Sequence, residues 1–142
     1  APLFHRVIED CTAGIHNSFD SLKLVEKKGW ISLYYARAVA YNNLNQYDKA
    51  FADFNHFLYI NPGHPEALYY RGTLLANQYN KNAEALNDFN KAIQLSPQGK
   101  YYFNRSICYF KLGDMAKAKA DGLMAEQKGV VLPDHYKRIL NL

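Results

Sequence analysis

Apolar side chains recur at helical spacing through most of the chain. Tyr34, Ala38 and Tyr41 stand at positions i, i+4 and i+7, which places them on one face of an α-helix. A second stretch repeats that spacing with Ala50, Phe54, Phe57 and Leu58. The period is that of helices and not the alternation of β-strands, so the sequence predicts an all-α fold built from short amphipathic helices.

These helical stretches recur as a repeat. Three segments align so that Arg37, Arg71 and Arg105 lie 34 residues apart: YYARAVAY (34–41), LYYRGTLL (68–75) and YFNRSICY (102–109). A second block follows each of them: DKAFADF (48–54), AEALNDF (83–89) and AKAKADG (116–122). We therefore expect three successive helix pairs, each of which depends on its neighbours for stability.

Each predicted pair contains a turn signal and the first two end in a proline. A residue that tolerates the left-handed backbone at a helix end lies between the two helices, namely Asn45, Asn80 and Gly113. Pro62 and Pro97 cannot continue a helix interior, so they should end the second helix of the first two pairs.

A 34-residue helix-turn-helix unit with this pattern of large and small residues resembles the tetratricopeptide repeat. The matching positions are Tyr34, Ala38, Tyr41, Ala50, Phe54 and Pro62, then Leu68, Gly72, Leu75, Ala85, Phe89, Ala92 and Pro97, then Tyr102, Ser106, Tyr109, Ala118 and Ala125. Phe57, Gly122 and Val130 depart from the family pattern. The resemblance implies a right-handed α-solenoid of stacked antiparallel helix pairs.

The repeat divides the chain into five expected segments within one domain. The three repeats should span residues 31–64, 65–98 and 99–132, and residues 133–142 should form a capping helix with Tyr136, Ile139 and Leu140 on its apolar side. Residues 1–30 should form a degenerate helix pair with a turn at residues 16–18. Its first helix would carry Leu3, Val7, Ile8, Cys11 and Ile15 on one face, and its second Phe19, Leu22 and Val25.

Composition adds constraints on the class of protein. No stretch approaches the ~18 apolar residues of a membrane-spanning helix, so we expect a soluble protein. The formal net charge is +4, and the basic excess falls in residues 98–142, with eight Lys and Arg against four Asp and Glu. The 12 Tyr and 8 Phe should mostly fill the core, and Cys11 and Cys108 should be two unpaired thiols.

No pattern of residues indicates catalysis. The chain has no Gly-rich phosphate loop, no Gly-x-Ser-x-Gly elbow and no His-Glu-x-x-His pair. Its five histidines never recur at i, i+3 or i+4, so no helix face offers two imidazoles to a metal ion. The sequence therefore predicts a protein that is not an enzyme and holds no cofactor or metal.

The three repeated arginines have acidic companions in the same register. Asp53, Asp88 and Asp121 follow Arg37, Arg71 and Arg105 by 16, 17 and 16 residues. Charges that keep step in this way predict structural ion pairs between the two helices of a unit, or with an adjacent unit. The alternative is a ladder of guanidinium groups that grips carboxylates or phosphates of a ligand.

The resemblance also implies a binding surface. In tetratricopeptide repeat proteins the first helices of successive repeats line a concave groove that receives an extended peptide or a partner helix. Carried over by repeat position, the groove residues are Tyr35, Val39, Asn42, Asn43, Tyr69, Tyr70, Thr73, Asn77, Lys100, Phe103, Asn104, Ile107 and Lys111. Tyr and Asn suit a peptide backbone better than a strongly charged ligand.

The leading hypothesis is thus a scaffold that binds a protein segment in this groove. Some members of the family grip the acidic C-terminal tails of chaperones with a set of residues called the carboxylate clamp. The corresponding positions here are Tyr35, Val39, Tyr70, Lys100 and Asn104, and only Lys100 matches the clamp. Binding of chaperone C-terminal tails is therefore not expected. The alternatives are single-stranded nucleic-acid binding through the groove aromatics and the basic C-terminal third, self-association through an end of the stack, or a non-catalytic appendage of a larger enzyme.

Overall fold

The computed structural model describes residues 2–19 and 27–142. These residues form helices and connecting turns without a β-strand, which confirms the predicted all-α fold. The chain divides into two compact units, residues 1–63 and residues 64–142.

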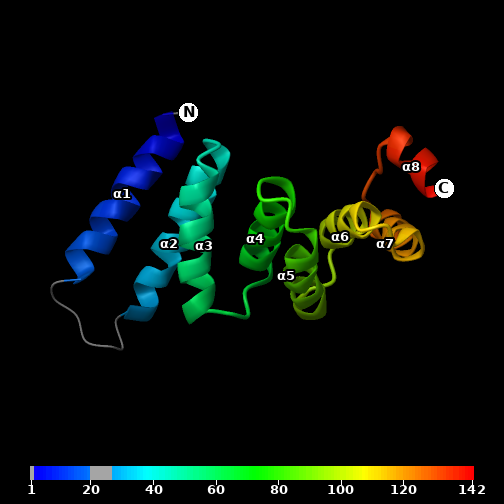
Figure 1. The fold of residues 1–142 in the computed structure, drawn as a ribbon. Helices are drawn as coiled ribbons and strands as arrows, with labels where there is room; N and C mark the ends of the chain where they lie inside the picture. Colours follow the sequence, from blue (N-terminus) through cyan, green and yellow to red (C-terminus); the bar gives the residue numbers. More distant parts are fainter. Residues whose placement is uncertain (1, 20–26) are drawn as a thin grey trace. The chain divides into compact units, whose positions relative to one another are not determined.

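The described residues of the first unit form three helices (Figure 1): α1 (Pro2–Phe19), α2 (Lys27–Asn43) and α3 (Tyr47–Ile60). Helix α2 packs against both α1 and α3. Its small residue Ala38 is fully buried, as are Ala50 and Phe54 of α3, so the two backbones approach closely around an aromatic side chain. Phe57, the departure from the family pattern, is also buried and lies against the ring of Tyr35.

The head of the chain differs from the expected helix pair. Helix α1 runs without interruption to Phe19, so the turn predicted at residues 16–18 is wrong. That segment contains neither Gly nor Pro, and nothing in it forces the helix to end. Cys11 and Ile15 are buried as expected, whereas Leu3 is 68% exposed. Phe19, expected on the second head helix, is instead the last residue of α1, and the other two residues of that expected helix, Leu22 and Val25, lie outside the described part of the chain.

The second unit contains two helix pairs and a short final helix (Figure 1). The pairs are α4 (Pro65–Asn77) with α5 (Asn82–Leu95), and α6 (Gly99–Lys111) with α7 (Met115–Gln127), and the final helix is α8 (Asp134–Leu140). Helix α5 also packs on α6, and α8 packs on α7. Gly72 allows the close approach of α4 and α5, because a Cβ atom there would lie 3.0 Å from Phe89 Cε1 and 3.2 Å from Asp88 Cβ.

The predicted turn residues adopt the predicted backbone. Asn45, Asn80 and Gly113 have φ angles of 58°, 53° and 85°, within the left-handed region that ends helices. The residue after each turn residue bonds back to the preceding helix, as in the hydrogen bond from Gln46 N to Tyr41 O at 2.9 Å. The turn chemistry read from the sequence is therefore confirmed.

The last repeat ends in a different way from the other two. Gly122 stands where the family has an aromatic residue, and a Cβ atom there would lie 2.7 Å from Leu140 Cδ1. Leu140 and Leu132 are each 1% exposed, so side chains from α8 and from the segment that follows α7 fill the space of the missing ring. The hydroxyl of buried Tyr136 adds a hydrogen bond to Ser106 Oγ at 2.9 Å. Ile139, expected on the apolar side of the final helix, is 40% exposed.

Candidate protein-binding surface

The three arginines of the repeat form structural ion pairs. Nε and Nη2 of Arg37, Arg71 and Arg105 donate hydrogen bonds of 2.6–2.8 Å to the two carboxylate oxygens of Asp53, Asp88 and Asp121, respectively. Each aspartate is only 6% exposed. These hydrogen bonds raise the pKa of each arginine further, against the effect of burial, so the guanidinium groups remain charged at any physiological pH.

Two of these arginines also contact the helix that precedes their own repeat. Arg37 Nη1 donates to Thr12 Oγ1 of α1 at 3.2 Å, and Arg105 Nη1 donates to Asn90 Oδ1 of α5 at 2.8 Å. Helix α1 thus contacts α2 much as α5 contacts α6. The predicted structural role of the arginines, between helices of one unit and towards a neighbour, is confirmed, and the guanidinium groups do not form an open ladder for a ligand.

The thirteen residues of the predicted groove all keep part of their surface. Asn43, Asn77 and Lys111 are exposed, and the other ten are half-buried. In the first unit the ring of Tyr35 rests on Phe54 and Phe57, with centroids 6.1 and 5.3 Å away. Asn43 Nδ2 donates to the carbonyl oxygen of Val39 at 2.8 Å. The α2 residues Tyr35, Val39, Asn42 and Asn43 are called the α2 face below.

In the second unit, side chains of α4 and α6 meet. The rings of Tyr69 and Tyr70 lie 5.6 Å apart, and Asn104 Nδ2 of α6 donates to the Tyr69 hydroxyl at 3.4 Å. The Thr73 hydroxyl donates to the Tyr69 carbonyl at 2.8 Å. Burial raises the pKa of Tyr69 despite the nearby charge of Lys100, so its hydroxyl stays protonated and can donate a hydrogen bond.

Two residues of the predicted groove serve the core instead. Phe103 and Ile107 pack against the cluster of Ala118, Tyr136 and Leu140, and the Phe103 and Tyr136 rings meet edge to face at 5.8 Å. The remaining predicted groove residues of this unit keep part of their area exposed, and Glu66 joins them through its contact with Lys100. Together they are Glu66, Tyr69, Tyr70, Thr73 and Asn77 of α4 with Lys100, Asn104 and Lys111 of α6. We call this set of residues the α4–α6 surface.

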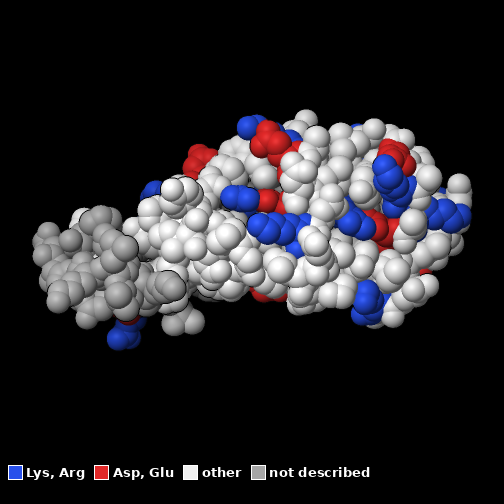
Figure 2. Space-filling model, turned by 90° about the horizontal axis from the view of Figure 1, so that it is seen from below, with Lys and Arg blue, Asp and Glu red and all other residues white. Residues whose placement is uncertain are grey.

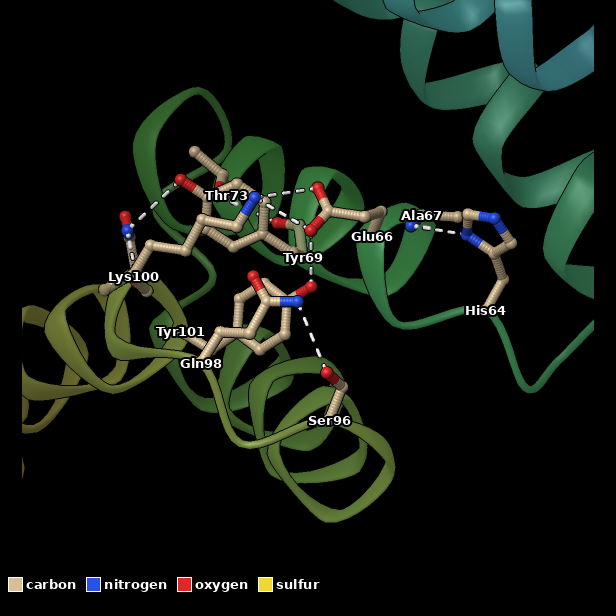
Figure 3. A network of polar contacts seen from close by, with 10 residues as sticks. His64, Glu66, Ala67, Tyr69, Thr73, Ser96, Gln98, Lys100 and Tyr101 are labelled. Carbon is tan, nitrogen blue, oxygen red and sulfur yellow. Dashed lines mark hydrogen bonds and ion pairs between the residues drawn. The ribbon is translucent and has the colours of Figure 1, made fainter. Parts of the chain in front are cut away.

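An ion pair crosses the α4–α6 surface (Figure 3). Lys100 Nζ lies 2.7 Å from Glu66 Oε1 and 2.9 Å from Glu66 Oε2. The Tyr101 hydroxyl donates to Glu66 Oε1 at 2.6 Å. Burial raises the pKa of Glu66, but the hydrogen bonds from Lys100 and Tyr101 outweigh it and lower the pKa below the ordinary value. The lysine that matches the carboxylate clamp is thus already paired with a carboxylate of the chain itself.

The sequence reasoning missed Glu66 as part of this surface and Tyr101 as the buried residue that holds its carboxylate. Glu66 and Lys100 lie 34 residues apart, which is one repeat length, so they occupy equivalent positions on successive first helices. A search for opposite charges at an offset of one repeat would have found the pair. Tyr101 gives no comparable signal in the sequence, because only the packing of α6 against α4 brings its hydroxyl to the Glu66 carboxylate.

Several cations of residues 98–142 are engaged in the fold. In this segment, all of which the structure describes, four of the eight cations lie in ion pairs: Lys100, Arg105, Lys117 and Lys137. Three of these pairs use acidic residues of the same segment, and Lys100 pairs with Glu66 of α4. Arg105 and Lys128 lie over the ring of Tyr102, and Arg105 and Lys117 over that of Tyr109. On the face that Figure 2 shows, blue and red atoms lie side by side in several places. This arrangement offers little support for the nucleic-acid alternative.

Neither cysteine is placed for nucleophilic chemistry. Cys11 and Cys108 are unpaired, as predicted, and both are buried. Burial raises the pKa of the Cys108 thiol to about 11, which suppresses the reactive thiolate. Within the described residues, no three His, Cys, Asp or Glu side chains gather as metal ligands. None of the helices in residues 2–19 and 27–142 is long and apolar enough to cross a membrane.

Comparisons with known proteins agree with the repeat register. A sequence model of the tetratricopeptide repeat family matches residues 31–64 and 99–121. A search of curated proteins by sequence found no match.

Solved structures with a similar fold include MamA AMB-1, at a TM-score of 0.70 and 18% identity over 87% of this chain and 68% of that chain. The first TPR of Spaghetti (RPAP3), bound to the HSP90 peptide SRMEEVD, aligns at 0.68 and 20% over 78% of this chain and 87% of that chain. The Yersinia enterocolitica type III secretion chaperone SycD, in complex with a peptide of the translocator YopD, aligns at 0.64 and 12% over 78% and 84%. With its paired helices, its 34-residue register and these matches, the chain has the tetratricopeptide repeat fold, and residues 31–64 and 99–121 match the sequence model of that family.

Proposed function

We propose that the chain is a non-catalytic scaffold that binds a peptide segment or a helix of a partner protein. The contact residues are those of the α4–α6 surface, with the α2 face as a second contact surface in the first unit. The observation that carries the proposal is that aromatic and amide side chains of α4 and α6 meet on this surface while keeping part of their area exposed.

The chemistry of this surface suits a polypeptide ligand. Tyrosine offers a large apolar face with few rotatable bonds, and the amide of Asn104 can donate to and accept from a peptide backbone. Tyr69 is held in place by rings on two helices, Phe89 at 6.3 Å and Tyr101 at 5.2 Å. A surface that is already ordered leaves most of the entropic cost of binding to the ligand. Two of the similar structures hold a peptide, which supports the same use here.

A panned peptide library tests this proposal. A random dodecapeptide library displayed on phage is selected on the intact chain, and the affinity of an enriched, fluorescently labelled peptide is measured by anisotropy. Tyr70→Ala and Asn104→Ala should each weaken binding about tenfold, because each removes a contact on the surface. The double variant Tyr35→Ala with Tyr69→Ala should abolish capture while circular dichroism shows unchanged helicity.

Tyr59→Ala is the matched control. Tyr59 is 88% exposed on α3 and belongs to neither contact surface, so its removal should leave the affinity unchanged. A library that yields no enriched peptide, or a peptide whose affinity survives all the surface variants, would refute the proposal.

A further inference from the structure

A lysine of the chain itself fills a small cation-binding site on the α4–α6 surface. The Lys100 ammonium lies 2.7 Å from a Glu66 carboxylate oxygen and over the rings of Tyr69 and Tyr101, at 5.1 and 5.5 Å from their centroids. Figure 3 shows Lys100 reaching from α6 to Glu66 on α4. A carboxylate combined with aromatic faces is a general arrangement for holding ammonium or guanidinium groups.

The walls of this site are fixed more firmly than the lysine they hold. Tyr101 is 0% exposed, and its hydroxyl holds Glu66 by a 2.6 Å hydrogen bond. Tyr69 packs between Tyr101 and Phe89. The Lys100 side chain is 43% exposed, and its ammonium group lies at the end of a flexible four-carbon chain. Of the charged groups in the site, Lys100 is therefore the one that can leave with the least disturbance.

Exchange of one cation for another costs little here. A ligand ammonium or guanidinium would regain the contacts with Glu66 and the rings, and Lys100 would regain water. Because partly exposed ion pairs contribute little to the stability of a protein, the chain does not hold Lys100 tightly. A ligand carboxylate would instead have to displace Glu66 and break the hydrogen bond from buried Tyr101.

We propose that this site receives a Lys or Arg side chain of the bound peptide, which takes the place of Lys100. The proposal rests on the proposed function and adds the sign of the ligand's charge at one point of the surface. The positive excess of residues 98–142 opposes a cationic ligand only weakly, because charges beyond about 8 Å are screened at physiological salt.

The same phage library provides the test. Dodecapeptides enriched on the intact wild-type chain should share a Lys or Arg at one common position. On the Glu66→Gln chain, which keeps the size of the side chain and loses its charge, that basic position should disappear. A wild-type-selected peptide should bind the Lys100→Ala chain more tightly, by up to about fivefold, because the competing ammonium of a partly exposed ion pair has been removed.

Lys91→Ala is the control for charge. It removes one exposed lysine of α5 in the same unit, outside both contact surfaces, so a gain that came only from the lower net positive charge would appear in both variants. A gain confined to Lys100→Ala supports displacement of Lys100, and an equal gain in Lys91→Ala would overturn it.

A rescue experiment tests the site with a probe of known structure. On the Lys100→Ala chain, n-propylammonium should shift the aromatic NMR signals of Tyr69 and Tyr101 in a saturable way, whereas n-propanol should not. No saturable shift would overturn the proposal, and the same titration on Lys100→Gln would serve if the alanine variant were unfolded.

The outcomes separate the two proposals. Enriched peptides without a common basic position, or with a common acidic one, leave the scaffold function standing and overturn this inference. A library that yields no enriched peptide overturns both.

Discussion

Among the ion pairs of the second unit, two kinds differ in burial: those inside its helix pairs and the one on the α4–α6 surface. The carboxylates of Asp88 and Asp121 are 6% exposed, and each receives two hydrogen bonds from one rigid guanidinium. Glu66 is paired with an ammonium group on a side chain that is 43% exposed. Both kinds follow the repeat register, so the register alone does not say what a charge pair does. Burial and the geometry of the donor decide between a structural bond and a contact that a ligand can replace.

The largest expected effect is that of Asp88→Ala. It should lower the free energy of unfolding by about 3 kcal/mol, because the Arg71 charge would lose the carboxylate that receives two of its hydrogen bonds. Urea unfolding followed by circular dichroism measures the change. Glu84→Ala is the control: Glu84 pairs with Lys81 on an exposed surface, so the loss should stay below about 0.5 kcal/mol. Equal losses of stability in the two variants would contradict the view that burial makes the Asp88 ion pair structural.

A smaller loss is expected from Arg71→Lys, which separates charge from geometry. Lysine keeps the positive charge but cannot make two parallel hydrogen bonds to one carboxylate. The same unfolding experiment should show a loss of about 1–2 kcal/mol. Arg138→Lys, on an exposed residue of α8, should leave stability unchanged. If Arg71→Lys also left stability unchanged, the two parallel hydrogen bonds of the guanidinium group would not be what distinguishes the buried ion pairs from the exposed one.

Glu66→Gln should change stability by less than about 1 kcal/mol, since its ion pair is partly open to solvent. Repeating the measurement in about 1 M NaCl should reduce even this difference, because salt screens exposed charges. A loss of the size expected for Asp88→Ala would show that the surface pair is also structural, and that Lys100 is not readily displaced.

The smallest effect is the pH dependence of the Glu66 contribution. The folded-state pKa of Glu66 lies below its ordinary value of 4.5, so the stability gained from its ionised form is present above that value. It is lost as the pH falls through the lowered pKa. The difference in unfolding free energy between wild type and Glu66→Gln should therefore be constant near neutral pH and shrink in acid. A difference that persists unchanged at the acid end would contradict an ionised Glu66 as its source.

The sequence predicted the parts of the fold that depend on local chemistry and on the repeat. Asn45, Asn80 and Gly113 were identifiable because few residues accept a positive φ angle. Arg71 and Asp88 were identifiable because in all three repeats an Asp follows the Arg by 16 or 17 residues. The turn at residues 16–18 was predicted without a residue that disfavours a helix, and α1 runs through it.

Contacts that depend on packing were harder to predict. Phe103 stands at a groove position by repeat register, yet α8 brings Tyr136 against its ring. Leu132 lies outside the predicted capping helix and is nearly fully buried. Both depend on where α8 docks, which the repeat period does not specify. Glu66 and Lys100 carried a readable signal in their 34-residue offset, but the role of Tyr101 needed the three-dimensional arrangement.

Gly122 and Leu140 pack closely together, because Leu140 Cδ1 occupies the volume that a larger side chain at residue 122 would need. Tandem duplication, by which repeat arrays usually grow, could not extend the stack past α7 by copying alone. An aromatic residue would first have to replace Gly122, and α8 would have to leave its position against α7. Designers who wish to lengthen or shorten this array should therefore treat α7 and α8 as one cassette and exchange them together.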